Sequence, residues 1–175
     1  MVLAWFSSHS IKVTKSIVSD IKAPAKVIVL GGAAVDIISK ANPSSDGSFP
    51  HKTTVSGSVT SSLGGVARNV AEAAHRILYA SGPSNKDTVL LISPVGADPF
   101  GNMVRDGVSA LGMRTDGILV SQIAGEASSL PRTAVCNMVL DGKGDLMAGI
   151  ADMDVTHSLS FSDVSTQVSC SGESK

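Results

Sequence analysis

Two adjacent glycines that lead into a patterned helix constrain this chain more than any other feature. They lie in the stretch Ser61-Ser62-Leu63-Gly64-Gly65-Val66-Ala67-Arg68-Asn69. Glycine permits positive φ and a close backbone approach, and the first amides of a helix have no intrahelical partner. Gly64 and Gly65 therefore fit either a plain strand-to-helix turn or a seat for an anionic or hydroxyl-rich ligand. The residues alone leave both interpretations open.

The segment after the glycines has a helical period. A repeating apolar face predicts the core side, formed by Val66, Val70, Ala73, Ala74, Ile77 and Leu78. The other side is predicted to face solvent and carries Arg68, Asn69, Glu72, His75 and Arg76, whose charges form i,i+4 pairs. Asn69 is a mediocre helix former in the opening turns. It is therefore a candidate to reach a ligand held over the helix start.

Two β-α units are predicted. Residues 27–30 and 88–92 are continuous apolar runs typical of buried parallel strands. Asp36 follows the first run, near the carboxyl end of a strand, where open α/β sheets bind ligands. After the second run, Asp98 and Pro99 form a helix start and Gly112 fits the position after the helix end. For Asp98 we prefer the structural role, because a cap accounts for it without a ligand.

The remaining pattern is β-rich. Residues 118–120, 133–140 and 146–150 are predicted strands, and the last two form an antiparallel hairpin added to the β-α-β-α framework. Its turn contains Lys143, which is either a phosphate contact or, as is more usual, a solvated lysine. Residues 41–62 are rich in turn formers, with short strands around 53–59. That excursion fits a lid or an ordinary surface loop.

Composition limits the classes of partner. The 175 residues suffice for one domain, and 43% apolar residues, 3% aromatics and 17 glycines favour an aliphatic α/β fold. A formal charge of −1 makes nucleic acid or an anionic membrane a poor partner. Cys136 and Cys170 are far apart, and neither they nor the scattered histidines have metal-ligand spacing. We expect two free thiols, no metal site and a soluble cytoplasmic protein.

The periodic patterns occupy only part of the chain. Residues 1–25 are lysine-containing and are predicted to be a leader or linker, whereas residues 155–175 are Ser-rich and irregular. Residues 26–154 therefore form the predicted domain. Its predicted strands make a half-sheet with an exposed edge, which natural domains seldom leave uncovered.

Four of these segments, in this order, resemble the N-terminal half of the PfkB (ribokinase-type) carbohydrate kinases. They are residues 29–36, 64–71, 95–101 and 111–113, and the resemblance covers roughly residues 26–154. It implies the N-terminal part of a ribokinase-like three-layer α/β/α fold with a small β lid. Arg68 before Asn69, together with residues 149–154, is most similar to the pseudouridine kinases, which phosphorylate the ribosyl 5′-hydroxyl of pseudouridine. Many eukaryotic members are fused behind a glycosidase, and residues 1–25 would suit the linker.

The resemblance also implies roles for particular residues. Asp36 would hydrogen-bond ribosyl hydroxyls, the backbone of Gly64 and Gly65 would pack against the sugar, and Asn69 would bind another hydroxyl. Arg68 is a weaker candidate. Residues 37–59 and the hairpin of residues 133–150 would contribute the lid.

One family motif is missing from the sequence. Family members carry a C-terminal Gly-Ala-Gly-Asp motif, which holds the catalytic base and the anion hole, and neither it nor a Walker loop occurs here. The full-length relatives use ATP and Mg²⁺, so we expect no ATP site, no catalytic residue and no turnover in this chain alone. The alternative hypothesis is a non-catalytic ligand-binding module, or one that forms a homodimer through the lid strands.

Overall fold

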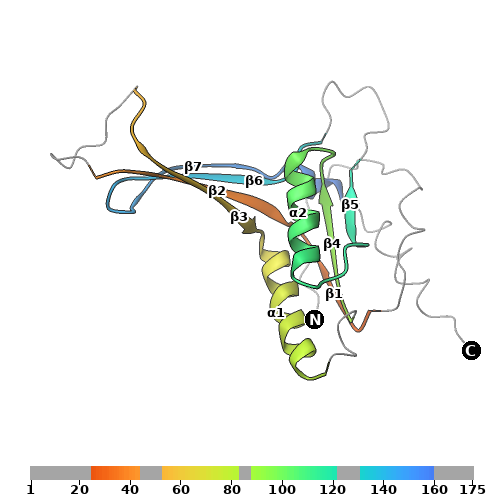
Figure 1. Ribbon diagram of the computed structural model, residues 1–175. Helices are drawn as coiled ribbons and strands as arrows, with labels where there is room; N and C mark the ends of the chain where they lie inside the picture. Colours follow the sequence, from red (N-terminus) through yellow and green to blue (C-terminus); the bar gives the residue numbers. More distant parts are fainter. Residues whose placement is uncertain (1–24, 44–52, 83–87, 122–130, 160–175) are drawn as a thin grey trace, which may run out of the picture.

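The computed structural model describes residues 25–43, 53–82, 88–121 and 131–159. The predicted leader before residue 25 lies outside these ranges, as do residues 160–175 of the predicted tail and with them Cys170. Within the described ranges the chain forms two β-sheets and two α-helices (Figure 1). None of the described helices is long and apolar enough to cross a membrane.

The first sheet, here called the body sheet, has three parallel strands in the order β1-β4-β5. Its strands are β1 (Val27–Leu30), β4 (Val89–Val95) and β5 (Ile118–Val120). All three strands form and are parallel, as predicted. The central strand β4 is buried along its whole length, whereas β1, predicted to be buried, is only partly so. β4 continues through Pro94, beyond its predicted end at residue 92. A proline is tolerated there because β1 pairs with β4 only as far as Ile92.

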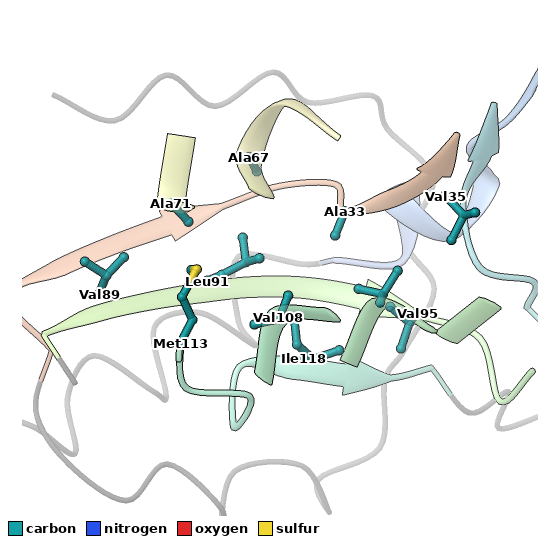
Figure 2. Packing of buried hydrophobic residues seen from close by; sticks show 11 residues of the cluster. Ala33, Val35, Ala67, Ala71, Val89, Leu91, Val95, Val108, Met113 and Ile118 are labelled. Carbon is teal, nitrogen blue, oxygen red and sulfur yellow. The ribbon is translucent and has the colours of Figure 1, made fainter. Parts of the chain in front are cut away.

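Two helices cover one face of the body sheet. They are α1 (Val66–Ala80) and α2 (Pro99–Ala110), and their small and branched side chains meet the strands in the main core (Figure 2). Val104 and Val108 of α2 are fully buried there, as their period predicts. Leu91 of β4 lies between the two helices and the neighbouring strands. This cluster is the largest continuous apolar contact in the described chain, so it holds the body together.

Alternate residues of β4 face the opposite side of the body sheet. Leu90 and Ile92 pack there with Leu119 of β5 and with Leu159. A short 3-10 helix, η3 (Asp154–Ser158), precedes Leu159, and its Val155 is 3% exposed. Residues 155–159, part of the segment predicted to be irregular, therefore form regular structure and core contacts.

The second sheet, here called the lid sheet, extends away from the body (Figure 1). Its order is β3-β2-β6-β7, with β2 (Ala34–Ala41), β3 (Gly57–Gly64), β6 (Val135–Leu140) and β7 (Leu146–Asp152). The β6-β7 hairpin is confirmed, and β6 pairs in parallel with β2, so the hairpin lies in the lid sheet, as the resemblance implies, and is not an addition to the strands of the β-α-β-α framework. Residues 57–62 of the turn-rich excursion likewise belong to this sheet, since β2 and β3 are paired antiparallel over eight residues.

The predicted core face of α1 is wrong in part: Ala74 and Leu78 pack against the core as predicted, but the rest of that face does not. Val66, Val70 and Ile77 are 81%, 53% and 68% exposed, whereas Arg68 and His75, predicted to face solvent, are buried. The residues that contact the sheet are Ala67, Ala71, Ala74 and Leu78. The helix carries two apolar stripes that have the same period and are offset by one residue. Periodicity alone does not show which of them faces the sheet. The stripe with more alanine does so, because alanine permits the closer approach to β1 and β4.

Both predicted ends of α2 are confirmed. Asp98 is the N-cap, and its Oδ1 accepts a hydrogen bond from the Gly101 amide at 2.8 Å. At the other end Gly112 has φ +77° and donates to Ser109, while Met113 donates to Val108. These two bonds are the Schellman arrangement, in which glycine supplies the left-handed residue.

Candidate functional site

Asp36 lies in the middle of the lid sheet, close to the body. It is partly buried on β2, opposite Ser62 of β3 on one side and Cys136 of β6 on the other. Residues paired in register share one face of a sheet. A row of a hydroxyl, a carboxylate and a thiol therefore crosses three strands. The sequence predicted Asp36 just beyond the end of β1, and the structure places it inside β2, the next strand along the chain.

Gly64 makes room for the Asp36 carboxylate. A Cβ atom added at Gly64 would lie 2.5 Å from Asp36 Cγ and Oδ1, and closer still to Oδ2. Real side chains do not approach so closely, so only glycine at this position leaves the carboxylate where it is. The structure thus brings together two of the residues predicted to bind the substrate.

Gly65 has a different reason to be glycine. It is the residue before α1, with φ +94°, and an added Cβ would lie 2.7 Å from Ala33 Cα and closer to the Gly32 carbonyl oxygen. The end of β3 therefore crosses the β1-β2 connection backbone to backbone. Gly65 also accepts the first helical hydrogen bond, from Asn69 at 3.0 Å, and no side chain caps this helix end.

The two remaining predicted residues lie in the first turn of α1. Asn69 is exposed, four residues after Gly65. Arg68 is only 9% exposed, and its guanidinium pairs with Glu72 at 2.7 Å, which also pairs with Arg76. The i,i+4 pairs predicted for these charges are present. Because Glu72 already engages the guanidinium of Arg68, this arginine is the weaker candidate for a ligand contact.

Hydrogen bonds fix the base of the lid sheet on the body. Ser93 of β4 accepts from the Ala33 amide at 2.8 Å, just before β2. Just before β6, the Thr133 amide and hydroxyl each donate to Asp98 at 2.7 Å, and the Gly96 amide donates to the Thr133 hydroxyl at 2.9 Å. The two central lid strands therefore leave the body from defined positions.

Asp98 is a structural carboxylate in this arrangement, as predicted. Burial acts to raise its pKa, but hydrogen bonds from Thr133, Gly101 and Phe100 outweigh burial and lower it from the ordinary value of 3.8. The sequence identified the helix cap but not the bonds to Thr133, which lies 35 residues further along the chain. No short-range pattern connects positions so distant.

Ser62 and Cys136 were not predicted as site residues. Both are neighbours of Asp36 in the lid sheet, and only the pairing of β2 with β3 and β6 shows this. The available signal was the period of two along residues 34–41, since every second side chain of a strand faces the same side. This period identifies the neighbours of Asp36 only when residues 34–41 are known to be a strand with partners on both sides.

The described residues offer no cluster of three or more His, Cys, Asp or Glu that could hold a metal ion. What the site can do is accept and donate hydrogen bonds, through Asp36, Ser62 and the exposed amide of Asn69. Such groups suit a ligand with several hydroxyls.

Comparison with solved structures finds the same fold in larger proteins. A candidate sugar kinase from Clostridium perfringens matches with a TM-score of 0.61 and 22% identity, over 83% of this chain and 40% of that one. A carbohydrate kinase from Agrobacterium tumefaciens (TM-score 0.53) and ribokinase from Giardia lamblia (TM-score 0.52) are also 22% identical, over 75% and 73% of this chain and 36% of theirs. This chain thus spans two fifths or less of the length of these neighbours.

The sequence comparison gives the family. No curated protein matched the chain. The family model described as pfkB family carbohydrate kinase matches residues 24–130, which is more than half of the 175 residues. That range includes β1 to β5, the glycine pair and the Asp98 turn. The chain therefore belongs to the pfkB family of carbohydrate kinases.

Proposed function

We propose that this chain supplies the sugar-binding half and the lid of a pfkB kinase that transfers phosphate from ATP to the hydroxymethyl group of a sugar or nucleoside. The observation that supports it most is the Asp36 carboxylate, seated against Gly64 in the row with Ser62 and Cys136. A carboxylate accepts hydrogen bonds from two neighbouring hydroxyls. A ligand without these hydroxyls would leave the carboxylate without hydrogen-bond partners.

Pseudouridine is the substrate that we favour. The support is the sequence Arg68-Asn69 after the glycine pair and residues 149–154 at the end of β7. Asn69 is exposed in the first turn of α1 and can offer both a donor and an acceptor to a ribosyl hydroxyl. The proposed location is the cytoplasm, in keeping with Cys136 being a free thiol.

A binding experiment on the 175-residue chain tests the sugar site. Isothermal titration with pseudouridine, uridine, ribose and fructose should show tightest binding of pseudouridine. Asp36→Asn should weaken it at least about tenfold, because a hydrogen bond to a charged group contributes about 1.5–3 kcal/mol. Asp145→Asn, in the exposed turn of the same sheet, is the matched control and should bind normally. Equal affinities of the two variants would refute the role of Asp36.

We further propose that the chain alone does not catalyse phosphoryl transfer. Phosphoryl transfer requires positioned groups that stabilise the transferred phosphate. The proposed contribution of this chain is limited to the acceptor side. Incubation of the purified chain with ATP, Mg²⁺ and pseudouridine should release no ADP above background in a coupled assay. Measurable turnover would contradict this part of the proposal.

A second candidate function is a homodimerisation module. The observation that favours it is the exposed apolar surface of the lid sheet, where Val59 and Ile150 are 71% and 73% exposed. On a free sheet, side chains of this size are typical of an interface. This function is compatible with the first, because Val59 and Ile150 lie on the sheet face opposite to Asp36.

A further inference from the structure

Thr133, two residues before β6 begins, directs both of its hydrogen-bond donors to one carboxylate. Its amide donates to Asp98 Oδ2 and its hydroxyl donates to Asp98 Oδ1, each at 2.7 Å. Thr133 is 1% exposed, so solvent does not supply an alternative acceptor. A buried amide that loses its acceptor destabilises the fold. The position of Thr133 is therefore tied to that of Asp98.

Two glycines bring the backbone before β6 into direct contact with the start of α2. A Cβ atom added at Gly96 would lie 2.5 Å from the Pro131 carbonyl oxygen and 2.7 Å from the Thr133 amide nitrogen. One added at Gly101 would lie 3.0 Å from the Thr133 hydroxyl oxygen. Side chains at either position would push these segments apart. The close contact leaves Thr133 little room to move while Asp98 holds it.

A short path of buried backbone links Thr133 to Asp36. The residue after Thr133, Ala134, accepts a hydrogen bond from the Val35 amide at 2.9 Å, and Ala134 and Val35 are both fully buried. Val35 directly precedes Asp36, whose register partner on β6 is Cys136. Close-packed backbone of this kind transmits a displacement instead of absorbing it. A shift of Thr133 therefore reaches β2 and β6 together, at the level of Asp36.

The other attachment of the lid sheet to the body is weaker. Before β2, the Ala33 amide donates a single hydrogen bond to the neutral hydroxyl of Ser93. Before β6, the acceptor is a carboxylate, and it takes two hydrogen bonds from one residue. Hydrogen bonds to an ionised acceptor are stronger than those between neutral groups. Asp98 is therefore the group on the body that does most to fix the central strands of the lid sheet.

We propose that Asp98 is a positioning residue of the sugar site. Besides capping α2, it fixes Thr133 and, through the start of β6, holds the Asp36 carboxylate in line with Ser62 and Cys136. Asp98 itself makes no contact with the ligand. This inference rests on the proposed role of Asp36 in sugar binding, and it gives Asp98 a part in that role which a helix cap alone does not require.

Two variants break the link, one from each side. In Asp98→Asn, Oδ1 can still cap α2, because Asn and Asp are similarly good caps, but an amino group replaces Oδ2 and faces the Thr133 amide. Thr133→Val keeps the shape of the side chain and removes its hydroxyl. Titration calorimetry should show at least about fivefold weaker binding of pseudouridine to either variant. Thr133→Ser restores the hydroxyl and should bind like wild type.

Val108→Ala separates positioning from general stability. Val108 is fully buried in α2, so the cavity left by this substitution lowers stability without touching the hydrogen bonds of Thr133. At a temperature at which every variant is folded, Val108→Ala should bind pseudouridine as tightly as wild type. Equal losses of affinity in Val108→Ala and Asp98→Asn, or no loss in Asp98→Asn, would overturn the proposal.

Amide hydrogen exchange of the ligand-free chain gives a readout that needs no sugar. Relative to the amides of β4, the Val35 amide should exchange at least about tenfold faster in Asp98→Asn than in wild type, because opening at Thr133 displaces its acceptor, the Ala134 carbonyl. Unchanged relative exchange would overturn the proposal whatever the affinities. If the wild-type chain bound none of pseudouridine, uridine, ribose and fructose while exchange was accelerated as expected, the sugar site would be wrong and the link from Asp98 to β2 would stand.

Discussion

At the scale of single residues, Gly65 joins the lid sheet to α1. Its φ of +94° and its contact with the backbone of Gly32 and Ala33 both exclude a side chain. We expect Gly65→Ala to destabilise the chain by about 2–4 kcal/mol, through backbone strain and overpacking together. The measurement is the midpoint of urea unfolding.

Gly144 provides the matched control for that variant. It has a similar φ of +99°, but the nearest atom to an added Cβ is the flexible end of Lys40, at 3.7 Å. Gly144→Ala should therefore cost only about 1–2 kcal/mol, the conformational part alone. If both variants lost the same stability, backbone crowding at Gly65 would have no energetic role.

Asp98 should give the chain an acid-sensitive component of stability. Its folded pKa is lowered below 3.8 by hydrogen bonds that outweigh burial, so the ionised form stabilises the fold. This contribution is complete above 3.8 and is lost as the pH falls through the folded pKa. At pH 7, Asp98→Ala should cost about 2–3 kcal/mol, from the lost cap and the unpaired Thr133 amide. Unfolding measured from pH 7 to pH 2 should show the difference between wild type and variant shrinking only at the acid end. A constant difference would mean that the carboxylate charge is irrelevant.

At the scale of elements, the sequence was sufficient wherever a local pattern has a single physical interpretation. Residues 89–92 are apolar throughout because a central parallel strand is buried on both faces, and they form the first part of β4. Asp98, Pro99 and Gly112 each satisfy a backbone requirement at a helix end, and they delimit α2. Such features depend on neighbours within a few residues. They can therefore be predicted without knowledge of the rest of the fold.

The lid sheet could not be predicted in the same way. β2 pairs with β6, about 100 residues later, and this pairing alone places Cys136 beside Asp36. β3 is almost entirely exposed and rich in serine, so it carries no apolar alternation. The resemblance to the family indicated a lid in this region. The register of the lid strands, and with it the row of Ser62, Asp36 and Cys136 across the sheet, could be obtained only from the structure.

His75 offers a test of the corrected orientation of α1. It is 5% exposed, and its Nδ1 has no hydrogen-bond partner among the described residues. His75→Leu would remove this unpaired polar group, which destabilises the fold by about 1–3 kcal/mol. It would also remove the stacking on Tyr79, which stabilises the fold by about 0.5–1.5 kcal/mol. We expect His75→Leu to raise stability by about 1 kcal/mol in urea unfolding. Arg76→Leu, on the exposed side, should change it by less than about 0.5 kcal/mol. A marked loss in His75→Leu would indicate an unseen partner for the imidazole.

At the scale of the whole molecule, the chain consists of two sheets that share few connections. The body sheet is covered by helices on one face, whereas the lid sheet extends from it and is largely exposed along β3 and β7 (Figure 1). Near the body, Val35, Ile37 and Leu63 of the lid sheet pack into the main core. On the same face, Val59 lies further out on β3, and Ile150 lies on β7 at the level of Ile37; neither has cover in the described chain. The lid sheet is therefore anchored near the body and carries exposed apolar side chains on its two edge strands.

These exposed side chains predict self-association through the lid sheet. Val59 and Ile150 lie on β3 and β7, the two edge strands, so a second copy laid across this face would bury both and leave the Asp36 row open. Light scattering after size exclusion should show a dimer at tens of micromolar, and Val59→Lys combined with Ile150→Lys should convert it to a monomer. Ile77→Lys, which charges the exposed side of α1 instead, is the control, and it should leave the dimer intact because Ile77 lies outside the lid sheet. If Ile77→Lys alone dissociated the dimer, self-association would run through α1, and the lid dimer would be wrong.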